Sequence, residues 1–360
     1  MKAAVCYEFN KPLVIEDVAL REPGKGEVKI RLAATAICHS DIHDWRGDLP
    51  GGVPFIGGHE SAGHVEKTGP GVTYVKVGEP VVVSLLASCG QCHYCNNGLR
   101  HLCEHRFDVP AVPRVRNKKG QALELKGNIG GFAGQVVVDE SQVVKIPKNM
   151  PLDRAALLAC GVTTGFGGVV NRAKVRPFQS VVVMGAGGVG INAIQGAAYS
   201  GAYPIIAVDV LESRLKTAMD FGASHAVNAR NEKAAEEIQK LTSGRGAEFV
   251  FVTVGSIGAI KQGMSFTCQR GTTVMIGLPS YKDQLSFVPM EMIFTEKNLI
   301  GGFMGATDLK RDIPNLVMLY QSGRLKLDEL ITGRFPLERI NEAMALTEKG
   351  EGLRNVIMFE

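Results

Sequence analysis

Four cysteines stand close together in one segment, ASCGQCHYCNNGLRHLCEH, at positions Cys89, Cys92, Cys95 and Cys103. Three thiolates at three-residue steps and a fourth a short loop away can close a tetrahedron around a soft divalent metal, and zinc suits a full thiolate set best. Scattered buried thiols are the alternative, but chance rarely produces this spacing. A closed set of four thiolates leaves no open position for a substrate. The segment therefore predicts a structural zinc site, with the reaction carried out elsewhere.

A glycine-rich turn indicates a second kind of chemistry, the binding of a dinucleotide. Gly185, Gly187 and Gly190 form G-A-G-G-V-G directly after SVVVM and directly before a helical stretch. The first glycine makes the turn, the second lets the backbone approach a pyrophosphate, and the third lets helix and strand pack closely. The amides at the start of the helix are then free to bind phosphate. A glycine-rich turn without a ligand is the alternative.

The preference between dinucleotides depends on Asp209, which ends PIIAVD and follows Gly190 by 19 residues. A carboxylate at this point accepts hydrogen bonds from an adenine-ribose diol and repels a 2′-phosphate. The sequence therefore favours NAD over NADP. Arg214 could line the same ribose, which softens the preference.

A second set of metal-binding residues is scattered along the chain. Cys38 lies in ICHSDIH, His59 in GGHESAGH and Cys160 in LLACGVTTG. Two thiolates and one imidazole are a catalytic type of zinc set, because they leave the fourth position to water or substrate. Sequence spacing alone leaves open whether these three residues meet. Glu60 could be an outer or transient ligand, and Asp41 could accept the other ring N–H of His59.

The elements that must position these residues fall into two patterns. Up to about residue 150 the chain has short alternating or apolar runs such as EVKIRLAATAI and EPVVVSL, which predict an all-β region. Within it, residues 105–130 are irregular and are expected to form a long surface loop. A helix is expected from Leu152, after Pro151. From Ser180 onward, strands alternate with helices, which predicts a doubly wound parallel sheet. The last strand is expected to return to the first domain.

Length and composition bound the possibilities further. A chain of 360 residues favours two domains, and 45% hydrophobic with 21% charged residues is typical of a globular protein. The net charge of +4 gives no reason to expect nucleic acid as a partner. The beginning of the chain lacks the apolar core of a signal peptide, and no apolar run is long enough to span a bilayer. Eight cysteines then indicate reduced thiols and metal ligands in a cytoplasmic protein, with no membrane association.

Taken in order, these motifs resemble those of a known protein family. C-H-S-D-I-H, G-G-H-E-S-A-G, the four-cysteine segment, A-C-G-V-T-T-G and G-A-G-G-V-G resemble the zinc-containing alcohol dehydrogenases of the medium-chain dehydrogenase/reductase superfamily. The resemblance extends over the whole chain. It implies an α/β protein with a GroES-like, mostly-β catalytic domain at residues 1–160 and 305–360, which carries the structural zinc lobe. A Rossmann NAD-binding domain is implied at residues 161–304.

The resemblance also implies roles for individual residues. Two zinc ions per chain are expected, a catalytic one on Cys38, His59 and Cys160 with Glu60 behind it, and a structural one on the four clustered cysteines. Ser40 matches the hydroxyl that hands the substrate proton toward the nicotinamide ribose, and His43 the histidine that passes it to solvent. The cofactor-binding residues are expected to be His39, Thr164, Gly185, Gly187, Gly188, Val189, Gly190, Asp209, Arg214 and Arg354, of which His39 and Arg354 lie near the pyrophosphate.

The implied activity is the reversible oxidation of an alcohol to an aldehyde or ketone. Polyol dehydrogenases of the superfamily usually carry Glu where this chain has Cys160, so the cysteine favours the alcohol dehydrogenase branch. A zinc-free quinone or enone reductase would lack the three-ligand set. A non-catalytic protein on this fold would be expected to lose Ser40, His43 or a ligand. A polyol dehydrogenase and a dehydrogenase of glutathione- or CoA-bearing alcohols remain as alternatives.

Substrate choice and assembly are less strongly encoded. Trp45, Leu49, Phe55 and Leu85 lie where family members line the alcohol pocket, although Phe55 is equally compatible with the core. Arg114, Arg116, Lys118 and Lys119 form a basic stretch that is either solvated surface or a site for an anionic substrate tail. TTVMIGL and KNLIGGF are candidate edge strands for pairing between subunits. Family members form dimers or tetramers, so a homodimer or homotetramer is expected.

Overall fold

The computed structural model describes residues 1–360, which divide into two compact units. The first comprises Met1–Cys160 and Asp308–Glu360, and the second comprises Gly161–Thr307. The sequence predicts the second boundary after residue 304, and the second compact unit extends to Thr307. The reason is the short turn η5 (Met304–Ala306), which packs against α4 (Gly161–Gly167) so closely that a Cβ on Gly305 would lie 2.1 Å from the Thr163 carbonyl oxygen.

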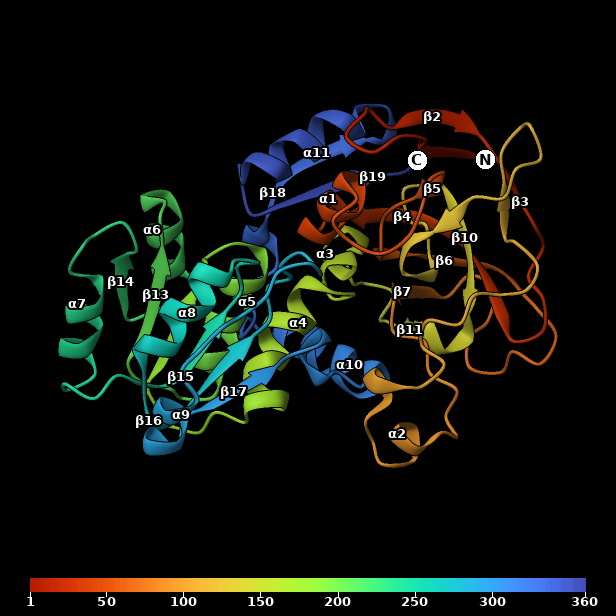
Figure 1. The fold of residues 1–360 in the computed structure, drawn as a ribbon. Coiled ribbons are helices and arrows are strands. Elements are labelled where there is room, and N and C mark those ends of the chain that lie inside the picture. The colour runs from red at the N-terminus through yellow and green to blue at the C-terminus, as the bar shows by residue number, and fades with distance from the viewer. The chain divides into compact units, whose positions relative to one another are not determined.

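The first unit is built on a seven-stranded sheet in the order β11-β7-β6-β4-β19-β18, with β10 also paired to β4 (Figure 1). Its strands are β4 (Glu27–Ala36), β6 (Glu60–Thr68), β7 (Pro80–Ser84), β10 (Gln135–Asp139), β11 (Val143–Lys145), β18 (Ile331–Pro336) and β19 (Arg354–Met358). The last strand, β19, pairs antiparallel with β4, with Val356 opposite Ala36. This confirms that the end of the chain returns to the first domain.

Smaller elements complete this unit. A four-stranded sheet has the order β2-β1-β5-β9, and β3 pairs with β8. These strands are β1 (Lys2–Cys6), β2 (Val14–Asp17), β3 (Ala19–Leu20), β5 (Phe55–Ile56), β8 (Val115–Arg116) and β9 (Glu124–Leu125). The helices are α1 (His39–Arg46), α2 (His93–Asn96), α3 (Leu152–Leu157), α10 (Leu309–Gln321) and α11 (Ile340–Lys349). Helix α3 begins as predicted, with Pro151 as its N-cap.

Residues 105–130 are not simply a surface loop, because β8, β9 and the turn η2 (Lys126–Asn128) lie within them. Arg114 is buried, and its Nε donates to the Glu27 carboxylate at 3.0 Å. Arg21 donates to the same carboxylate through both terminal nitrogens. A buried carboxylate between two guanidiniums ties this segment to the start of β4, and these arginines hold the pKa of Glu27 below its usual range against the opposing effect of burial.

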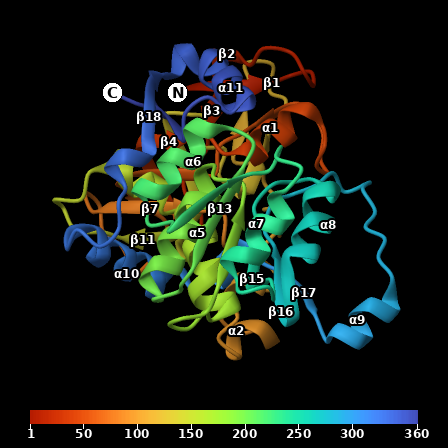
Figure 2. The ribbon, with the colours of Figure 1, turned by 90° about the vertical axis from the view of Figure 1, so that its left-hand side faces the viewer.

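The second unit contains a six-stranded parallel sheet in the order β14-β13-β12-β15-β16-β17. Strands β13, β15, β16 and β17 are labelled in Figure 2. The strands are β12 (Val181–Met184), β13 (Ile205–Asp209), β14 (His225–Asn228), β15 (Ala247–Val252), β16 (Thr267–Met275) and β17 (Asn298–Gly301). The helices are α4, α5 (Gly188–Tyr199), α6 (Glu212–Asp220), α7 (Ala234–Leu241), α8 (Ile257–Phe266) and α9 (Pro289–Thr295). The predicted doubly wound parallel sheet is confirmed.

One of the two predicted edge strands is wrong. Strand β16, which contains the start of TTVMIGL, pairs on one side with β15 and on the other with β17, so it lies inside the sheet. Strand β17 from KNLIGGF is the edge. The two sequences look alike because each is a short apolar run, and only the strand order tells an edge from an interior strand. None of the helices is both long and apolar enough to span a bilayer.

Candidate active site and metal centres

The start of α1 places three of the predicted residues side by side. Cys38 is the N-cap, in extended conformation, and the Asp41 side chain accepts the Cys38 backbone N–H at 2.8 Å. This is the reciprocal arrangement of a capping box, in which a side chain of the first turn bonds back to the cap. The cap fixes the direction of the Cys38 thiol relative to the helix, and Ser40 follows in the same turn.

Asp41 also orients His59, as the sequence predicts. Its other carboxylate oxygen accepts the His59 Nδ1–H at 3.2 Å and the Gly58 backbone N–H at 3.0 Å. Because a carboxylate can only accept, the proton lies on Nδ1 and the lone pair of Nε2 is free for a metal. Burial alone lowers the pKa of His59, but the Asp41 charge outweighs it, and the pKa rises well above its usual range.

The backbone conformation of Gly58 allows His59 to come within hydrogen-bonding distance of Asp41. Its φ is +86°, and a Cβ there would lie 2.7 Å from both the ring and the backbone nitrogen of Phe132. A side chain at this position would therefore push His59 away from Asp41.

The structure brings the scattered set together. Ligand atoms of Cys38, His59, Glu60 and Cys160 all lie within 4.8 Å of one another, and all four residues are buried. Cys160 lies beyond the end of α3 and Glu60 begins β6, so the cluster forms only when these segments pack. A hydrogen bond between the thiols lowers the pKa of Cys38 well below its usual range and raises that of Cys160. Two thiols that share a proton in this way are prepared to bind a divalent cation as thiolates.

Glu60 supports the assignment of this cluster to a metal. One of its oxygens accepts from Nη2 of Arg354 at 2.5 Å, whereas the other is fully buried without a hydrogen-bond partner. Burial raises the pKa of Glu60 to about 7. Buried polar atoms are rarely left unpaired, so an orphan carboxylate oxygen beside two thiols and an imidazole fits a zinc ion. The expected contact of Arg354 with the pyrophosphate stays a prediction, since its side chain is buried against Glu60.

The predicted proton path begins beside this cluster. Ser40 Oγ lies 3.4 Å from His59 Nε2, which puts the hydroxyl next to the metal position. His43 lies further along α1, with its ring 5.7 Å from that of exposed His39 and its Nδ1 3.0 Å from the Asp48 carboxylate. Sequence reasoning missed Asp48 and the pairing of Glu60 with Arg354. The available signal for Asp48 was the glycine directly before it in WRGD, because a glycine that ends a helix turns the next residue back toward the last turn of that helix.

The four clustered cysteines also converge, with their sulfurs within 4.8 Å of one another. Backbone N–H groups of Cys89 and His105 donate to Cys103 Sγ at 3.3 and 3.4 Å, and that of Cys92 donates to Cys89 Sγ at 3.4 Å. Backbone donors from Glu104 and Cys95 lower the pKa of Cys92 to about 6. Amides that point at sulfur stabilise thiolates, so this donor set fits a structural zinc ion.

The glycine-rich turn of the second unit has the expected geometry. Gly185 has φ of +91°, and a Cβ on Gly190 would lie 1.7 Å from the Gly185 carbonyl oxygen, so strand and helix touch there. A Cβ on Gly187 would meet only Nη1 of Arg214, at 3.9 Å, so the space over the second glycine is open. Gly187 is the N-cap of α5, and Gly188 and Val189 begin the helix. An open, positively polarised helix start fits a pyrophosphate.

Asp209 has a structural role in addition to its predicted role in cofactor binding. Its carboxylate accepts the backbone N–H of Ala186 at 2.7 Å, and those of Val210 and Leu211 at 2.7 and 3.0 Å. Arg214 lies 3.7 Å away. Because a carboxylate offers about four acceptor positions, one remains for a ribose hydroxyl.

Thr164 lies on α4, whose Gly165 packs against the Val189 carbonyl, so these two predicted cofactor residues are neighbours.

The predicted substrate-pocket residues separate into two places. Leu85 lies near His59, since a Cβ on Gly127 would meet the Cβ atoms of both, at 3.1 and 3.0 Å. Phe55 is a core residue, 2% exposed, with Lys126 Nζ over its ring at 5.0 Å. Leu49 lies in the loop after α1 and stays a prediction.

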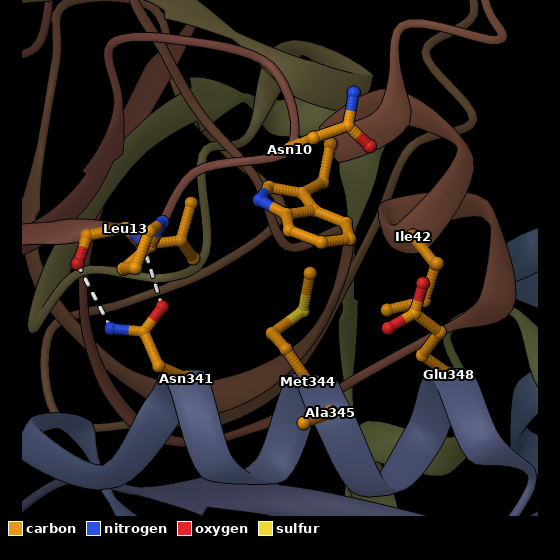
Figure 3. Close-up of a pocket in the computed structure, with 9 residues that line it drawn as sticks. Asn10, Leu13, Ile42, Asn341, Met344, Ala345 and Glu348 are labelled. Atoms are coloured by element: carbon orange, nitrogen blue, oxygen red, sulfur yellow. Dashed lines mark hydrogen bonds between the residues drawn. The ribbon is translucent and has the colours of Figure 1, made fainter.

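Trp45 lines a pocket together with Ile42 of α1 and with Asn341, Met344 and Ala345 of α11; Figure 3 labels these four neighbours. Its Nε1–H donates to the Lys11 carbonyl at 2.7 Å. The side chain is turned there because Trp45 stands roughly 140° around the helix from Ser40, at 3.6 residues per turn. Several polar groups of this pocket are paired within the chain: Asn341 with the backbone of Leu13, Glu348 with Arg46, and the Asn10 amide with the Arg46 carbonyl. Pro12 also lines this pocket.

Comparison with known proteins agrees with this geometry. Residues 24–148 match the alcohol dehydrogenase GroES-like domain, and residues 188–322 match the zinc-binding dehydrogenase domain. Alcohol dehydrogenase B of Mycobacterium tuberculosis is 37% identical over 99% of this chain and 98% of its own length. The chain belongs to the zinc-containing alcohol dehydrogenases of the medium-chain dehydrogenase/reductase superfamily.

Two further members of the zinc alcohol dehydrogenase family are similar over their full length. The NDMA-dependent alcohol dehydrogenase of Amycolatopsis methanolica is 37% identical over 99% of this chain and 98% of its own. The crystal structure of benzyl alcohol dehydrogenase from Acinetobacter calcoaceticus superposes with a TM-score of 0.93 at 31% identity, covering 100% of this chain and 99% of that one. As an alcohol dehydrogenase of this family, the chain is an oxidoreductase that acts on alcohols.

Proposed function

We propose that this alcohol dehydrogenase oxidises an alcohol reversibly to an aldehyde or ketone by hydride transfer to NAD, with two zinc ions per chain. The observation that carries the proposal is the buried cluster of two thiols, an imidazole and a carboxylate, whose ligand atoms lie within 4.8 Å of one another, and one oxygen of that carboxylate has no hydrogen-bond partner. Cys38, His59 and Cys160 would hold the catalytic ion, which leaves one position for the alcohol oxygen. Cys89, Cys92, Cys95 and Cys103 would hold the structural ion.

The cofactors supply the chemistry that no side chain here supplies: zinc acts as a Lewis acid on the alcohol oxygen, and NAD accepts the hydride. The chain's own residues orient the metal ligands and transfer the proton of the alcohol. Asp41 keeps the His59 proton on Nδ1 and so keeps Nε2 available for the metal. Ser40 Oγ, beside that nitrogen, would accept the proton that the alcohol gives up while passing its own hydroxyl proton toward the nicotinamide ribose, and His43 would release a proton from there to water.

The charge of Asp209 supports NAD as the cofactor. Its carboxylate is buried at the end of β13, beside the glycine-rich turn, where a 2′-phosphate would meet a negative charge. Arg214 at 3.7 Å offsets part of that charge, so a preference for NAD is expected rather than a strict exclusion of NADP.

The structure favours a neutral substrate. Arg114 is paired with Glu27, Arg116 donates to the Gly120 carbonyl, and Lys118 lies 3.5 Å from Asp17. Two of the four charges of the basic stretch, those of Arg114 and Lys118, are therefore ion-paired within the chain, which supports a neutral substrate over one with a carboxylate, phosphate, glutathione or CoA group. Cys160, as part of the buried cluster, favours an alcohol dehydrogenase over a polyol dehydrogenase.

Metal analysis and a substrate panel test the proposal together. Purified protein is expected to contain about two zinc ions per chain. It should reduce NAD with neutral alcohols, including benzyl alcohol, and NADP less well. NDMA belongs in the panel as an alternative acceptor, because one relative is NDMA-dependent. The C38S variant should lose turnover and one zinc ion, and a C38S variant with full activity and two zinc ions would contradict the mechanism.

We also propose a cytoplasmic homo-oligomer, a dimer or tetramer. Support for the compartment comes from the eight free cysteines, because thiolate ligands are kept available where thiols stay reduced. Support for assembly comes from the second unit, where β17 is an unpaired sheet edge and the nearby helix α9 exposes apolar side chains. Light scattering of the purified protein measures the state directly.

A further inference from the structure

The end of α1 is a helix-stop motif that fixes Asp48 against His43. Gly47 has φ of +77° and donates its N–H to the Asp44 carbonyl at 3.1 Å, and Asp48 donates its N–H to the His43 carbonyl at 2.9 Å. These two bonds define a Schellman motif, in which the residue after the glycine folds back onto the helix. The residues that meet across such a motif are usually apolar. Here they are a histidine and an aspartate.

The side chains complete a second connection between the same two residues. His43 Nδ1 lies 3.0 Å from Asp48 Oδ2, and the His43 side chain is 18% exposed and that of Asp48 35%. Because a carboxylate can only accept, Nδ1 carries the proton and Nε2 carries the lone pair. The backbone bond and the side-chain bond together hold the imidazole in one tautomer and one orientation.

The loop that carries Asp48 is also held at its far end. The Gly52 N–H donates to Glu124 at 3.1 Å, and Glu124 accepts from Lys126 at 2.8 Å. Lys126 is itself buried and lies 3.5 Å from Asp44 of α1. Burial raises the pKa of Asp44 to about 6, although Lys126 opposes the rise. The loop therefore runs between two attachments to the helix, which leaves Asp48 little freedom to move away from His43.

We propose that Asp48 is a positioning residue of the proton path, acting through His43. The proposal rests on the function proposed above, in which His43 releases the substrate proton to water. Neutral His43 keeps its Nδ1–H on Asp48 and accepts the arriving proton at Nε2. The resulting imidazolium keeps its Nδ1–H on the Asp48 carboxylate until Nε2 gives the added proton to water, so the residue returns to its starting state with no net change. The neighbouring charged groups on the same helix are His39, whose ring lies 5.7 Å from that of His43, and Asp44, which is paired with Lys126.

The test is a double-mutant cycle on D48N and H43Q, read as the single-turnover rate of NADH formation so that product release cannot hide the effect. D48N keeps the size of the side chain and the backbone N–H that closes the motif. It should lower this rate about tenfold, with KM for the alcohol changed less than about twofold, as expected for loss of a partner that orients a histidine. In the H43Q background the same change should have no further effect.

The chain offers a matched control in a second histidine–aspartate pair, His105 with Asp108, at 2.8 Å and exposed. D108N should leave the rate unchanged. The inference is overturned if D48N is as fast as the wild type, if D108N slows the enzyme equally, or if D48N slows the H43Q enzyme by the same factor as the wild type. Zinc content and the thermal midpoint, measured on each variant, should match the wild type; a D48N protein that loses zinc or unfolds early would assign Asp48 to structure and also overturn it. Absence of turnover in the wild type would instead refute the proposed function.

Discussion

At the scale of single residues, Asp41 holds both the cap of α1 and the imidazole of His59. Its two oxygens accept three N–H groups, from Cys38, Gly58 and His59. In D41N one oxygen becomes an NH2 group, which cannot accept and would face an N–H donor. We expect zinc affinity at the catalytic cluster, and activity with it, to fall about 10- to 100-fold. After dialysis against a weak chelator, metal analysis should show about one zinc ion per chain.

The exposed aspartate Asp17, 3.5 Å from Lys118, provides the control for this change. D17N should retain two zinc ions and full activity, because surface ion pairs contribute little. A D41N enzyme that keeps both ions under the same dialysis would show that His59 does not depend on this carboxylate.

Single residues could be predicted from the sequence where their chemistry is local. The cysteines of the four-thiolate segment lie within fifteen positions, and their sulfurs converge as the spacing predicts. Cys38 and Cys160 are 122 positions apart, so their contact depends on how α3 packs on the sheet, and only the resemblance to a family could unite them. The place of Trp45 in the alcohol pocket was expected only from the resemblance to the family and stays a prediction; in the structure its side chain lines a pocket with residues of α11.

At the scale of elements, the strand–turn–helix of the nucleotide site separates two roles of glycine. A Cβ on Gly190 would lie 1.7 Å from a backbone oxygen, whereas one on Gly187 would have open space. G190A should therefore destabilise the protein by about 3 kcal/mol or more, because the clash is with backbone. G187A should lower the unfolding free energy by no more than about 1 kcal/mol, the loss expected for alanine at an N-cap. It should nevertheless weaken NADH binding at least about tenfold, because the methyl group occupies the place of the pyrophosphate.

Chemical unfolding and NADH fluorescence titration measure the two effects separately. If G187A binds NADH as tightly as the wild type, the dinucleotide does not pass over this turn. If G190A is as stable as the wild type, the close contact between strand and helix is not rigid.

Helices and strands could be predicted from the sequence where the spacing of apolar residues distinguishes one from the other. The alternation of the second unit predicts strands and helices close to those observed, from β12 and α5 onward. The segment 105–130 was less predictable, because the buried position of Arg114 depends on Glu27, which is 87 positions away. A charged residue in an irregular stretch is usually solvated, and its burial becomes visible only with its partner.

At the scale of the whole molecule, the second unit has an apolar surface that a single copy leaves exposed. Figure 2 shows α9 at the end of an extended segment, beside the part of the sheet that contains β16 and the edge strand β17. Its residues Met290, Ile293 and Phe294 are 63%, 72% and 78% exposed, and the edge strand β17 begins shortly after the helix ends. Contiguous exposed apolar residues beside an open sheet edge are typical of subunit interfaces.

The exposed apolar side chains of α9 therefore predict where a substitution should disrupt the proposed homo-oligomer. F294E places a charge where a second copy would bury an aromatic ring, and loss of one well-buried aromatic commonly costs about 2 kcal/mol of binding free energy. The mass from light scattering should fall toward that of one chain on dilution. Phe178 lies elsewhere in the same unit and is 87% exposed, so F178E adds the same charge away from α9 and should leave the mass unchanged. If F294E keeps the wild-type mass while F178E lowers it, the subunits meet through a different face of the molecule.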